Sequence, residues 1–177
     1  MKSDFKTEDL KELIREVPGF PKEGILFYDI TTLLLDSDGF RMSIKEMADS
    51  FSGSKVDVVA GIESRGFIFG AAIADRLGVG FVPIRKPGKL PSTTIAASYS
   101  LEYGSDALEV HEDAIKTGQR VLLVDDLLAT GGTAEASVRL INECGGEVAG
   151  FSFLIELEFL DGRSKLSGTR LSTVLKY

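Results

Sequence analysis

An apolar segment that runs directly into two adjacent acidic residues places the strongest constraint on this sequence. Residues 121–124 read Val-Leu-Leu-Val, which is typical of a buried strand, and Asp125 and Asp126 follow them. The small residues 129–132 come next, and a helical pattern begins at Thr133. A strand, a small-residue loop and a helix in this order indicate an open α/β sheet, in which ligands bind outside the carboxyl ends of the strands.

The loop can bind a phosphate group, and the two acids beside it are suited to a sugar diol. Backbone N–H groups at a helix N-terminus form an anion site when no large side chain obstructs them. The two common nucleotide-binding patterns, G-x-x-x-x-G-K-[ST] and G-x-G-x-x-G after a strand, are absent. The sequence therefore predicts a site for a ribose 5-phosphate, made of Asp125, Asp126, Ala129, Thr130, Gly131, Gly132 and Thr133.

Helical and strand patterns alternate along the rest of the chain, which predicts an α/β protein with a parallel sheet covered on both faces. The segment 87–113 is too long for a simple connection, so we expect it to contain a hairpin. Residues 161–168 are expected to form a loop, and Asp29 is interpreted as a turn residue before Thr31. We expect helices over residues 7–17, 40–51, 67–77 and 133–143, and strands over residues 56–62, 80–84, 119–124, 147–157 and 171–175.

Composition argues against several classes of protein. The chain has 177 residues and is 44% hydrophobic, which fits one domain with a packed core. We expect no membrane association, since no apolar run approaches the roughly 18 residues of a membrane span and the first ten residues are too polar for a secretory signal. A single cysteine excludes an intrachain disulfide and favours a cytoplasmic setting. The net charge of −7 argues against nucleic acid as a partner.

Two reactive side chains are interpreted as structural. His111 is the only histidine, which argues against a Ser-His-Asp triad or a metal site of several histidines. Cys144 precedes two glycines at a predicted helix end, where a small apolar filler is expected. We therefore predict that the protein supplies no metal site of its own.

One stretch of this acidic chain is basic. No acidic residue lies between Asp75 and Glu102. Two interpretations are open for this stretch: a solvated surface loop, or a binding site for a polyphosphate. Its basic residues are Arg76, Arg85, Lys86 and Lys89.

Residues 121–133 resemble the phosphoribosyl-pyrophosphate-binding motif of the type I phosphoribosyltransferases. Four further segments are similar, in the same order, to segments of the adenine phosphoribosyltransferases: residues 24–31, 61–67, 83–91 and 99–104. The resemblance implies a single domain over residues 1–177 with the type I phosphoribosyltransferase fold, a twisted, mostly parallel sheet flanked by helices. It also implies a small N-terminal hood over about residues 1–35 and a flexible hairpin lid over about residues 87–113.

The resemblance further implies a reaction of purine salvage, in which adenine and phosphoribosyl pyrophosphate give AMP and pyrophosphate. Mg²⁺ would be carried on phosphoribosyl pyrophosphate, and the protein would be a homodimer. Glu102 is the implied catalytic acid or base. The implied pyrophosphate-binding residues are Glu63, Ser64, Arg65, Arg85, Lys86 and Lys89.

The base-binding residues implied by the resemblance are Leu26, Phe27 and Tyr28, with Phe27 stacking on adenine. Many relatives carry Arg where this chain has Tyr28, so we expect recognition of the base edge by the backbone of Leu26 and Tyr28. An enzyme for 6-oxopurines or orotate is one alternative, but enzymes for hypoxanthine and guanine usually have Asp in place of Ala129. A purine-sensing regulator is the other, and it would usually carry a DNA-binding domain, for which this chain has no room.

Overall fold

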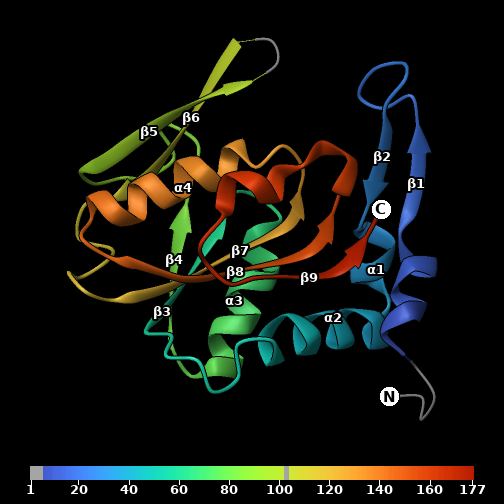
Figure 1. The fold of residues 1–177 in the computed structure, drawn as a ribbon, viewed down its shortest axis with the longest axis horizontal. Helices are drawn as coiled ribbons and strands as arrows, with labels where there is room; N and C mark the ends of the chain where they lie inside the picture. Colours follow the sequence, from blue (N-terminus) through green and yellow to red (C-terminus); the bar gives the residue numbers. More distant parts are fainter. Residues whose placement is uncertain (1–5, 102–103) are drawn as a thin grey trace. The chain divides into compact units, whose positions relative to one another are not determined.

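The computed structural model describes residues 6–101 and 104–177, and of residues 100, 101, 104 and 105 only the backbone. The chain divides into two compact units, Met1–Glu46 and Met47–Tyr177. Figure 1 shows the fold coloured along the sequence. None of the helices within the described residues has the length and apolar character that a membrane span needs.

The first unit begins with a 3₁₀ helix, η1 (Thr7–Leu13), and a two-stranded antiparallel sheet of β1 (Arg15–Pro18) and β2 (Leu26–Asp29). The prediction of one helix over residues 7–17 is therefore wrong for residues 14–17. The chain becomes extended at Ile14, and Val17 pairs with Phe27 across the hairpin. Strand partners further along the chain, such as Phe27 for Val17, decide this conformation, which a local apolar spacing does not reveal.

Two helices follow, and an aspartate side chain binds the start of each. Asp29 accepts hydrogen bonds from the backbone N–H of Thr31 at 2.9 Å and from its hydroxyl at 2.7 Å, so the predicted turn role is confirmed. These bonds lie at the start of α1 (Thr31–Leu35). Asp36 accepts the N–H of Gly39 at 2.8 Å, and α2 (Ser37–Asp49) therefore begins three residues before the predicted residue 40.

The second unit is built on a five-stranded parallel sheet in the order β4-β3-β7-β8-β9, which confirms the predicted sheet. Helix α3 contacts β3, β4 and β7, and α4 contacts β7 and β8. Because β3 leads to β4 on one side and β7 leads to β8 on the other, right-handed crossovers place α3 and α4 on opposite faces (Figure 1). The elements are β3 (Val58–Ile62), α3 (Gly66–Leu77), β4 (Gly80–Ile84), β7 (Arg120–Leu128), α4 (Gly132–Glu143), β8 (Glu147–Glu156) and β9 (Leu171–Lys176).

Burial on both faces explains the continuous apolar runs of the central strands. Leu122 and Leu123 are both fully buried although successive strand side chains point to opposite faces. Strand β7 continues to Leu128, four residues beyond its predicted end, because Asp125 and Leu127 still pair with β8. The acidic residues thus lie within the last part of the strand rather than after it.

A hairpin of β5 (Thr94–Leu101) and β6 (Gly104–His111) occupies the segment 87–113, as predicted. Its base is bonded to the end of β4, where Arg85 and Glu109 exchange two backbone hydrogen bonds of 2.9 and 2.7 Å. The hairpin also contacts α4, and the guanidinium of Arg139 donates to the carbonyl of Ser98 at 2.6 Å. Its base is therefore part of the second unit's packed structure.

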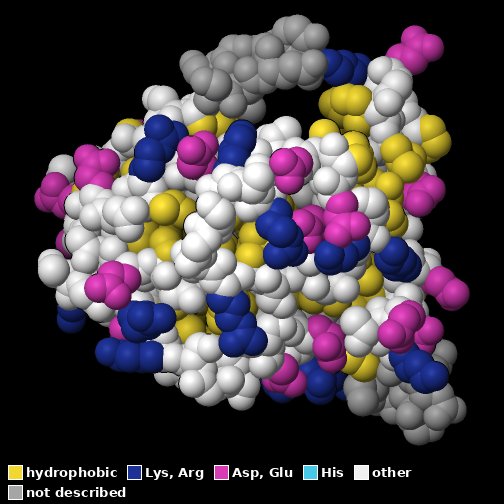
Figure 2. All heavy atoms as spheres, in the orientation of Figure 1, with side chains coloured by type: hydrophobic (Ala, Val, Ile, Leu, Met, Phe, Trp, Pro, Cys, Tyr) yellow, Lys and Arg dark blue, Asp and Glu magenta, His cyan; other side chains and the backbone are white. Residues whose placement is uncertain are grey.

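Short 3₁₀ helices, η2 (Glu158–Leu160) and η3 (Gly162–Leu166), connect β8 to β9. The prediction of a plain loop over residues 161–168 is thus wrong for Gly162–Leu166, where Gly162 and Leu166 are buried. On the face seen in Figure 2, acidic and basic side chains are intermixed, with apolar side chains between them.

Candidate active site

A cavity of about 310 Å³ opens at the carboxyl ends of β3 and β7. Between these two strands the order of the sheet reverses, and open α/β sheets bind their ligands at such a point. The cavity brings together eleven of the residues that the sequence predicted, from two segments about sixty residues apart and from the basic stretch. They are Glu63, Ser64, Arg65, Lys86, Asp125, Asp126, Ala129, Thr130, Gly131, Gly132 and Thr133.

Residues 129–133, the phosphate loop, connect β7 to α4 across the cavity wall. Gly131 has φ +76° and is the N-cap of α4, so the left-handed region that glycine favours is required here. The Gly131 carbonyl accepts the N–H of Glu135 at 2.9 Å, which begins the helical hydrogen-bond ladder. The first N–H groups of a helix have no partner within the helix, and they carry its positive dipole end. The predicted position of this loop at a helix N-terminus is confirmed.

Asp125 and Asp126, the acidic pair, meet the cavity from the end of β7. The backbone N–H of Asp126 donates to Oδ1 of Asp125 at 2.8 Å. Nε of Arg65 lies 2.9 Å from Oδ2 of Asp126, whose side chain is only 6% exposed. Arg65 belongs to the turn after β3, so this ion pair joins the two strand ends that flank the point of reversal.

Burial of two carboxylates side by side alters their acidity. Burial first, and the neighbouring charge of Asp126 second, raise the pKa of Asp125 well above its ordinary value of 3.8. Burial also raises the pKa of Asp126, and the guanidinium of Arg65 opposes that rise. The pair is therefore tuned by its surroundings, as groups at functional sites often are.

Gly66 allows the approach of α3 to the acidic pair, a role that the sequence analysis missed. A Cβ atom at this position would lie 2.8 Å from Oδ1 of Asp125 and 2.9 Å from the carbonyl oxygen of Val124. The helix N-terminus and the end of β7 thus touch without a side chain between them. Gly66 stands within the segment 61–67 that carried the resemblance, but the sequence does not reveal which atoms it faces.

Glu63 organises the basic residues after β4. Its Oε2 accepts the backbone N–H of Lys86 at 2.9 Å and Nε of Arg85 at 3.3 Å. The Arg85 guanidinium also donates to the carbonyl of Lys89 at 3.0 Å and lies over the ring of Phe67. Lys86 lines the cavity, whereas Arg85 and Lys89 are outside its lining.

The hairpin adds three side chains to the cavity region that the sequence analysis missed. Nζ of Lys86 contacts Oδ2 of Asp106 at 2.9 Å, and the Tyr99 hydroxyl donates to the same oxygen at 3.1 Å. The bond to Asp106 raises the pKa of Lys86, and the ammonium lowers the pKa of Asp106. Tyr99 and Leu108 line the cavity from β5 and β6. The alternating pattern of a hairpin strand gives no sign of which face meets the cavity.

The residues predicted to bind adenine lie in β2 of the first unit. Leu26 is 38% exposed and Tyr28 is buried at 8%. Burial, with a smaller contribution from Glu16, raises the pKa of Tyr28. The ring of Phe27 meets Phe20 edge to face at 5.0 Å between centroids. Glu102, the predicted catalytic residue, lies outside the described residues.

The two side chains interpreted as structural lie at the ends of β6 and α4. His111 ends β6. Cys144 packs half-buried against the core at the end of α4, and burial raises the pKa of its thiol, as expected of a filler. Among residues 6–101 and 104–177, no three acidic, histidine or cysteine side chains converge as a metal site would require.

Comparison with known proteins agrees with this arrangement. Residues 32–170 match the family model of the phosphoribosyl transferase domain. The sequence is 58% identical over 170 residues to adenine phosphoribosyltransferase of Acidobacterium capsulatum, covering 96% of this chain and 94% of that protein. The chain therefore belongs to the phosphoribosyltransferase family, and within it to the adenine phosphoribosyltransferases.

Solved structures give the same result for the fold. The crystal structure of adenine phosphoribosyltransferase from Thermoanaerobacter pseudethanolicus matches with a TM-score of 0.95 and 54% identity, covering 97% of this chain and all of that one. The enzyme from Saccharomyces cerevisiae, complexed with an imino-altritol bisphosphate and adenine, matches with a TM-score of 0.90 and 42% identity, covering 96% and 98%. The expectation of a type I phosphoribosyltransferase fold is confirmed.

Proposed function

We propose that this protein transfers the 5-phosphoribosyl group of phosphoribosyl pyrophosphate to adenine, giving AMP and pyrophosphate. One observation carries the proposal: a phosphate loop, an acidic pair and Arg65 line a single cavity at the point where the sheet order reverses. Relatives more than half identical to this chain are named adenine phosphoribosyltransferases, which supports adenine as the acceptor.

The chemistry follows from the charges in the cavity. The phosphate loop binds the 5-phosphate through its backbone N–H groups, Thr130 and Thr133. The acidic pair accepts hydrogen bonds from the ribose hydroxyls, and these bonds strengthen as the departing C1′ carbon gains oxocarbenium character. Arg65, with its planar guanidinium, binds the pyrophosphate that leaves.

The remaining pyrophosphate and base contacts are assigned in the same proposal. Glu63, Ser64, Arg85, Lys86 and Lys89 complete the pyrophosphate site, in which the Glu63 carboxylate orients the backbone after β4. Leu26, Phe27 and Tyr28 bind adenine, with an aromatic face on the base contributing roughly 1–3 kcal/mol. Glu102 takes or relays the proton that leaves the ring as N9 attacks.

Mg²⁺ enters in this proposal as part of the substrate. Phosphates and water are the ligands that Mg²⁺ keeps in most phosphate-transfer sites, with few protein carboxylates. An ion held in this way would neutralise charge on the leaving pyrophosphate. The hood over residues 1–35, closure of the segment 87–113 as a lid, a homodimer and a cytoplasmic location remain predictions.

The experiment is to incubate the protein with phosphoribosyl pyrophosphate, Mg²⁺ and each of adenine, hypoxanthine, guanine and orotate, and to measure the nucleotide formed. AMP is expected to form much faster than IMP, GMP or OMP, because Ala129 supplies no carboxylate for a 6-oxopurine. Faster formation of IMP would refute the choice of adenine and leave the family assignment intact. Activity should disappear in excess chelator and return with Mg²⁺.

A further inference from the structure

In the segment between β8 and β9, the backbone of Gly162 contacts the phosphate loop. A Cβ atom on Gly131 would lie 2.6 Å from the carbonyl oxygen of Gly162, and 3.2 Å from its Cα. A Cβ atom on Gly162 would clash with the carbonyl oxygen of Ala129 and lie 2.8 Å from the Gly131 nitrogen. Two glycines thus meet backbone to backbone at the phosphate loop, and Gly162 itself does not line the cavity.

The turn that carries Gly162 is tightly bonded. The N–H of Asp161 donates to the carbonyl of Glu158 at 3.1 Å, and the hydroxyl of Ser164 donates to the carbonyl of Asp161 at 2.7 Å. Asp161 has φ +49°, a left-handed conformation that aspartate tolerates better than most residues. Because the turn is internally bonded, the contacts that attach it to the sheet also determine the position of Gly162.

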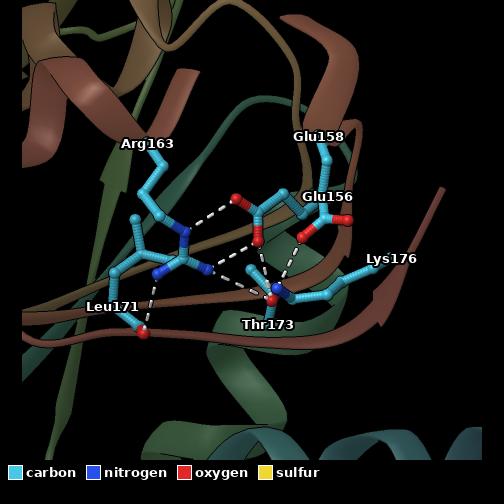
Figure 3. Close-up of polar contacts among 6 residues, drawn as sticks. All are labelled: Glu156, Glu158, Arg163, Leu171, Thr173 and Lys176. Atoms are coloured by element: carbon cyan, nitrogen blue, oxygen red, sulfur yellow. Dashed lines mark hydrogen bonds and ion pairs between the residues drawn. The ribbon is translucent and has the colours of Figure 1, made fainter. Parts of the chain in front are cut away.

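The anchor is a bidentate ion pair between the turn and the end of β8. Arg163 donates from Nε to Oε1 of Glu156 at 2.8 Å and from Nη2 to Oε2 at 2.6 Å (Figure 3). The Thr173 hydroxyl of β9 donates to the same Oε2 at 2.9 Å. The Glu156 side chain is 5% exposed, so its carboxylate is nearly removed from water. We call Glu156, Arg163 and Thr173 the carboxylate clamp.

The clamp is linked to the strand that ends in the phosphate loop. Glu156 is opposite Leu128 in the β7–β8 register, and the N–H of Leu157 donates to the carbonyl of Leu128 at 2.9 Å. The clamp is therefore connected to the phosphate loop in two ways. One series of contacts runs through Gly162, and the other runs through β8 to Leu128, the residue before the loop. Both lie within the second unit.

We propose that the carboxylate clamp positions the phosphate loop, by fixing Gly162 against Ala129 and Gly131 so that the loop N–H groups point at the 5-phosphate. The inference rests on the proposed function, in which this loop binds that phosphate. Glu156, Arg163 and Gly162 are positioning residues, since all act through the loop backbone. A bidentate pair between a guanidinium and a buried carboxylate is well suited to this role, because its hydrogen bonds are strong and fix the relative orientation of the two groups.

The clamp is intact over the pH range of an ordinary assay. The bonds from Arg163 lower the pKa of Glu156 below its ordinary value of 4.5. The stability that this pair contributes is therefore present above that ordinary value, and it is lost only as the pH falls through the lowered pKa. Effects of substitution measured near pH 7 thus report on the ion pair and not on protonation of Glu156.

The test compares the binding of AMP with that of adenosine, which lacks the phosphate, by calorimetry in Gly162→Ala and Glu156→Gln. AMP affinity should fall by about tenfold or more, since displacements below 1 Å in a positioned group are costly. Adenosine affinity should stay within about twofold of the parent's, because adenosine makes no phosphate contact that the substitutions could weaken. In the forward reaction the KM for phosphoribosyl pyrophosphate should rise while the KM for adenine stays unchanged.

Two further variants complete the experiment. Lys176→Gln is the matched control, because it removes an exposed ion pair with Glu158 on the same edge and should leave both affinities unchanged. Arg163→Lys keeps the charge but loses the bidentate geometry, so its AMP affinity should lie between those of the parent and Glu156→Gln. Circular dichroism and the melting temperature identify any variant that does not fold.

Folded Gly162→Ala and Glu156→Gln proteins with the parent's ratio of AMP to adenosine affinity would overturn the clamp and leave the proposed function standing. An equal loss of both affinities would also overturn it, because it would indicate general loosening rather than displacement of the loop. A parent that binds no 5′-phosphate would instead refute the proposed function on which the clamp rests.

Discussion

Gly66→Ala tests how closely the acidic pair is positioned by the helix beside it. The added Cβ would stand 2.8 Å from Oδ1 of Asp125, 2.9 Å from the Val124 carbonyl oxygen and 3.2 Å from Cα of Asp125. Ordinary contact begins near 3.4 Å, so the two elements must separate by about half an ångström. Two of the three atoms are backbone, which means that no side-chain rotation can relieve the contact.

Both stability and rate should respond to this separation. Overpacking of this kind costs about 1–3 kcal/mol, and each kcal/mol lowers the melting temperature by roughly 2–4 °C in a chain of this size. A shift of half an ångström in the acidic pair should reduce kcat/KM by about tenfold, since a shift of 1 Å can cost about 10²-fold. The assay is AMP formation well below the melting temperature, so that all of the protein is folded.

Gly70→Ala is the matched control on the same helix. Its Cβ would stand 2.8 Å from the Phe81 ring and 3.3 Å from the Gly61 Cα, away from the cavity lining. It should lower the melting temperature by a similar amount and leave kcat/KM within about twofold of the parent, as expected of a substitution that misplaces no catalytic group. Equal kinetic losses in the two variants, or parent kinetics in Gly66→Ala, would refute the reasoning that contact with Asp125 is what matters.

Two further substitutions test the acidic pair and the predicted acid or base. Because the pKa of Asp125 is raised in the folded protein, its contribution to stability is present below its ordinary pKa of 3.8 and is lost as the pH rises through the folded value. Asp125→Asn should therefore have a higher melting temperature than the parent at pH 7, while its kcat/KM falls. A lower melting temperature would contradict burial as the cause of the pKa shift. Glu102→Leu should lower kcat by about 10²–10⁴-fold, the usual contribution of general acid–base catalysis, with the melting temperature nearly unchanged; a kcat within about threefold of the parent, far below that range, would remove Glu102 from the mechanism.

The sequence predicted the elements of the second unit well, because each signal there is local and strong. The apolar run before Asp125 identifies a buried strand, the glycine at 78 with φ +70° marks a helix end, and the small-residue loop before α4 marks a turn, all without help from distant residues. The same locality explains the predicted site, since the phosphate loop and the acidic pair are contiguous. Parallel strand ends then bring Arg65 to them by topology alone.

What the sequence could not predict depends on partners far along the chain. The apolar spacing of Leu10, Leu13, Ile14 and Val17 fits one helix, yet Val17 pairs with Phe27 in a four-residue strand. Lys86 was interpreted as part of a solvated loop or of a polyphosphate site, and neither interpretation included its ion pair with Asp106 of the hairpin. Such pairs arise when the fold closes, and neither residue of a pair carries a local sign of the other.

The contact between Gly131 and Gly162 restricts how this part of the chain can change by substitution. When two side chains meet, a larger residue on one side can be offset by a smaller one on the other. Here neither residue has a side chain left to remove, and Gly131 also requires a positive φ. A larger residue at either position therefore cannot be compensated by any amino acid at the other. It could be accommodated only by a change in the length of the connecting segments. Sequence variation near this contact is expected as insertions or deletions outside it, with both glycines retained.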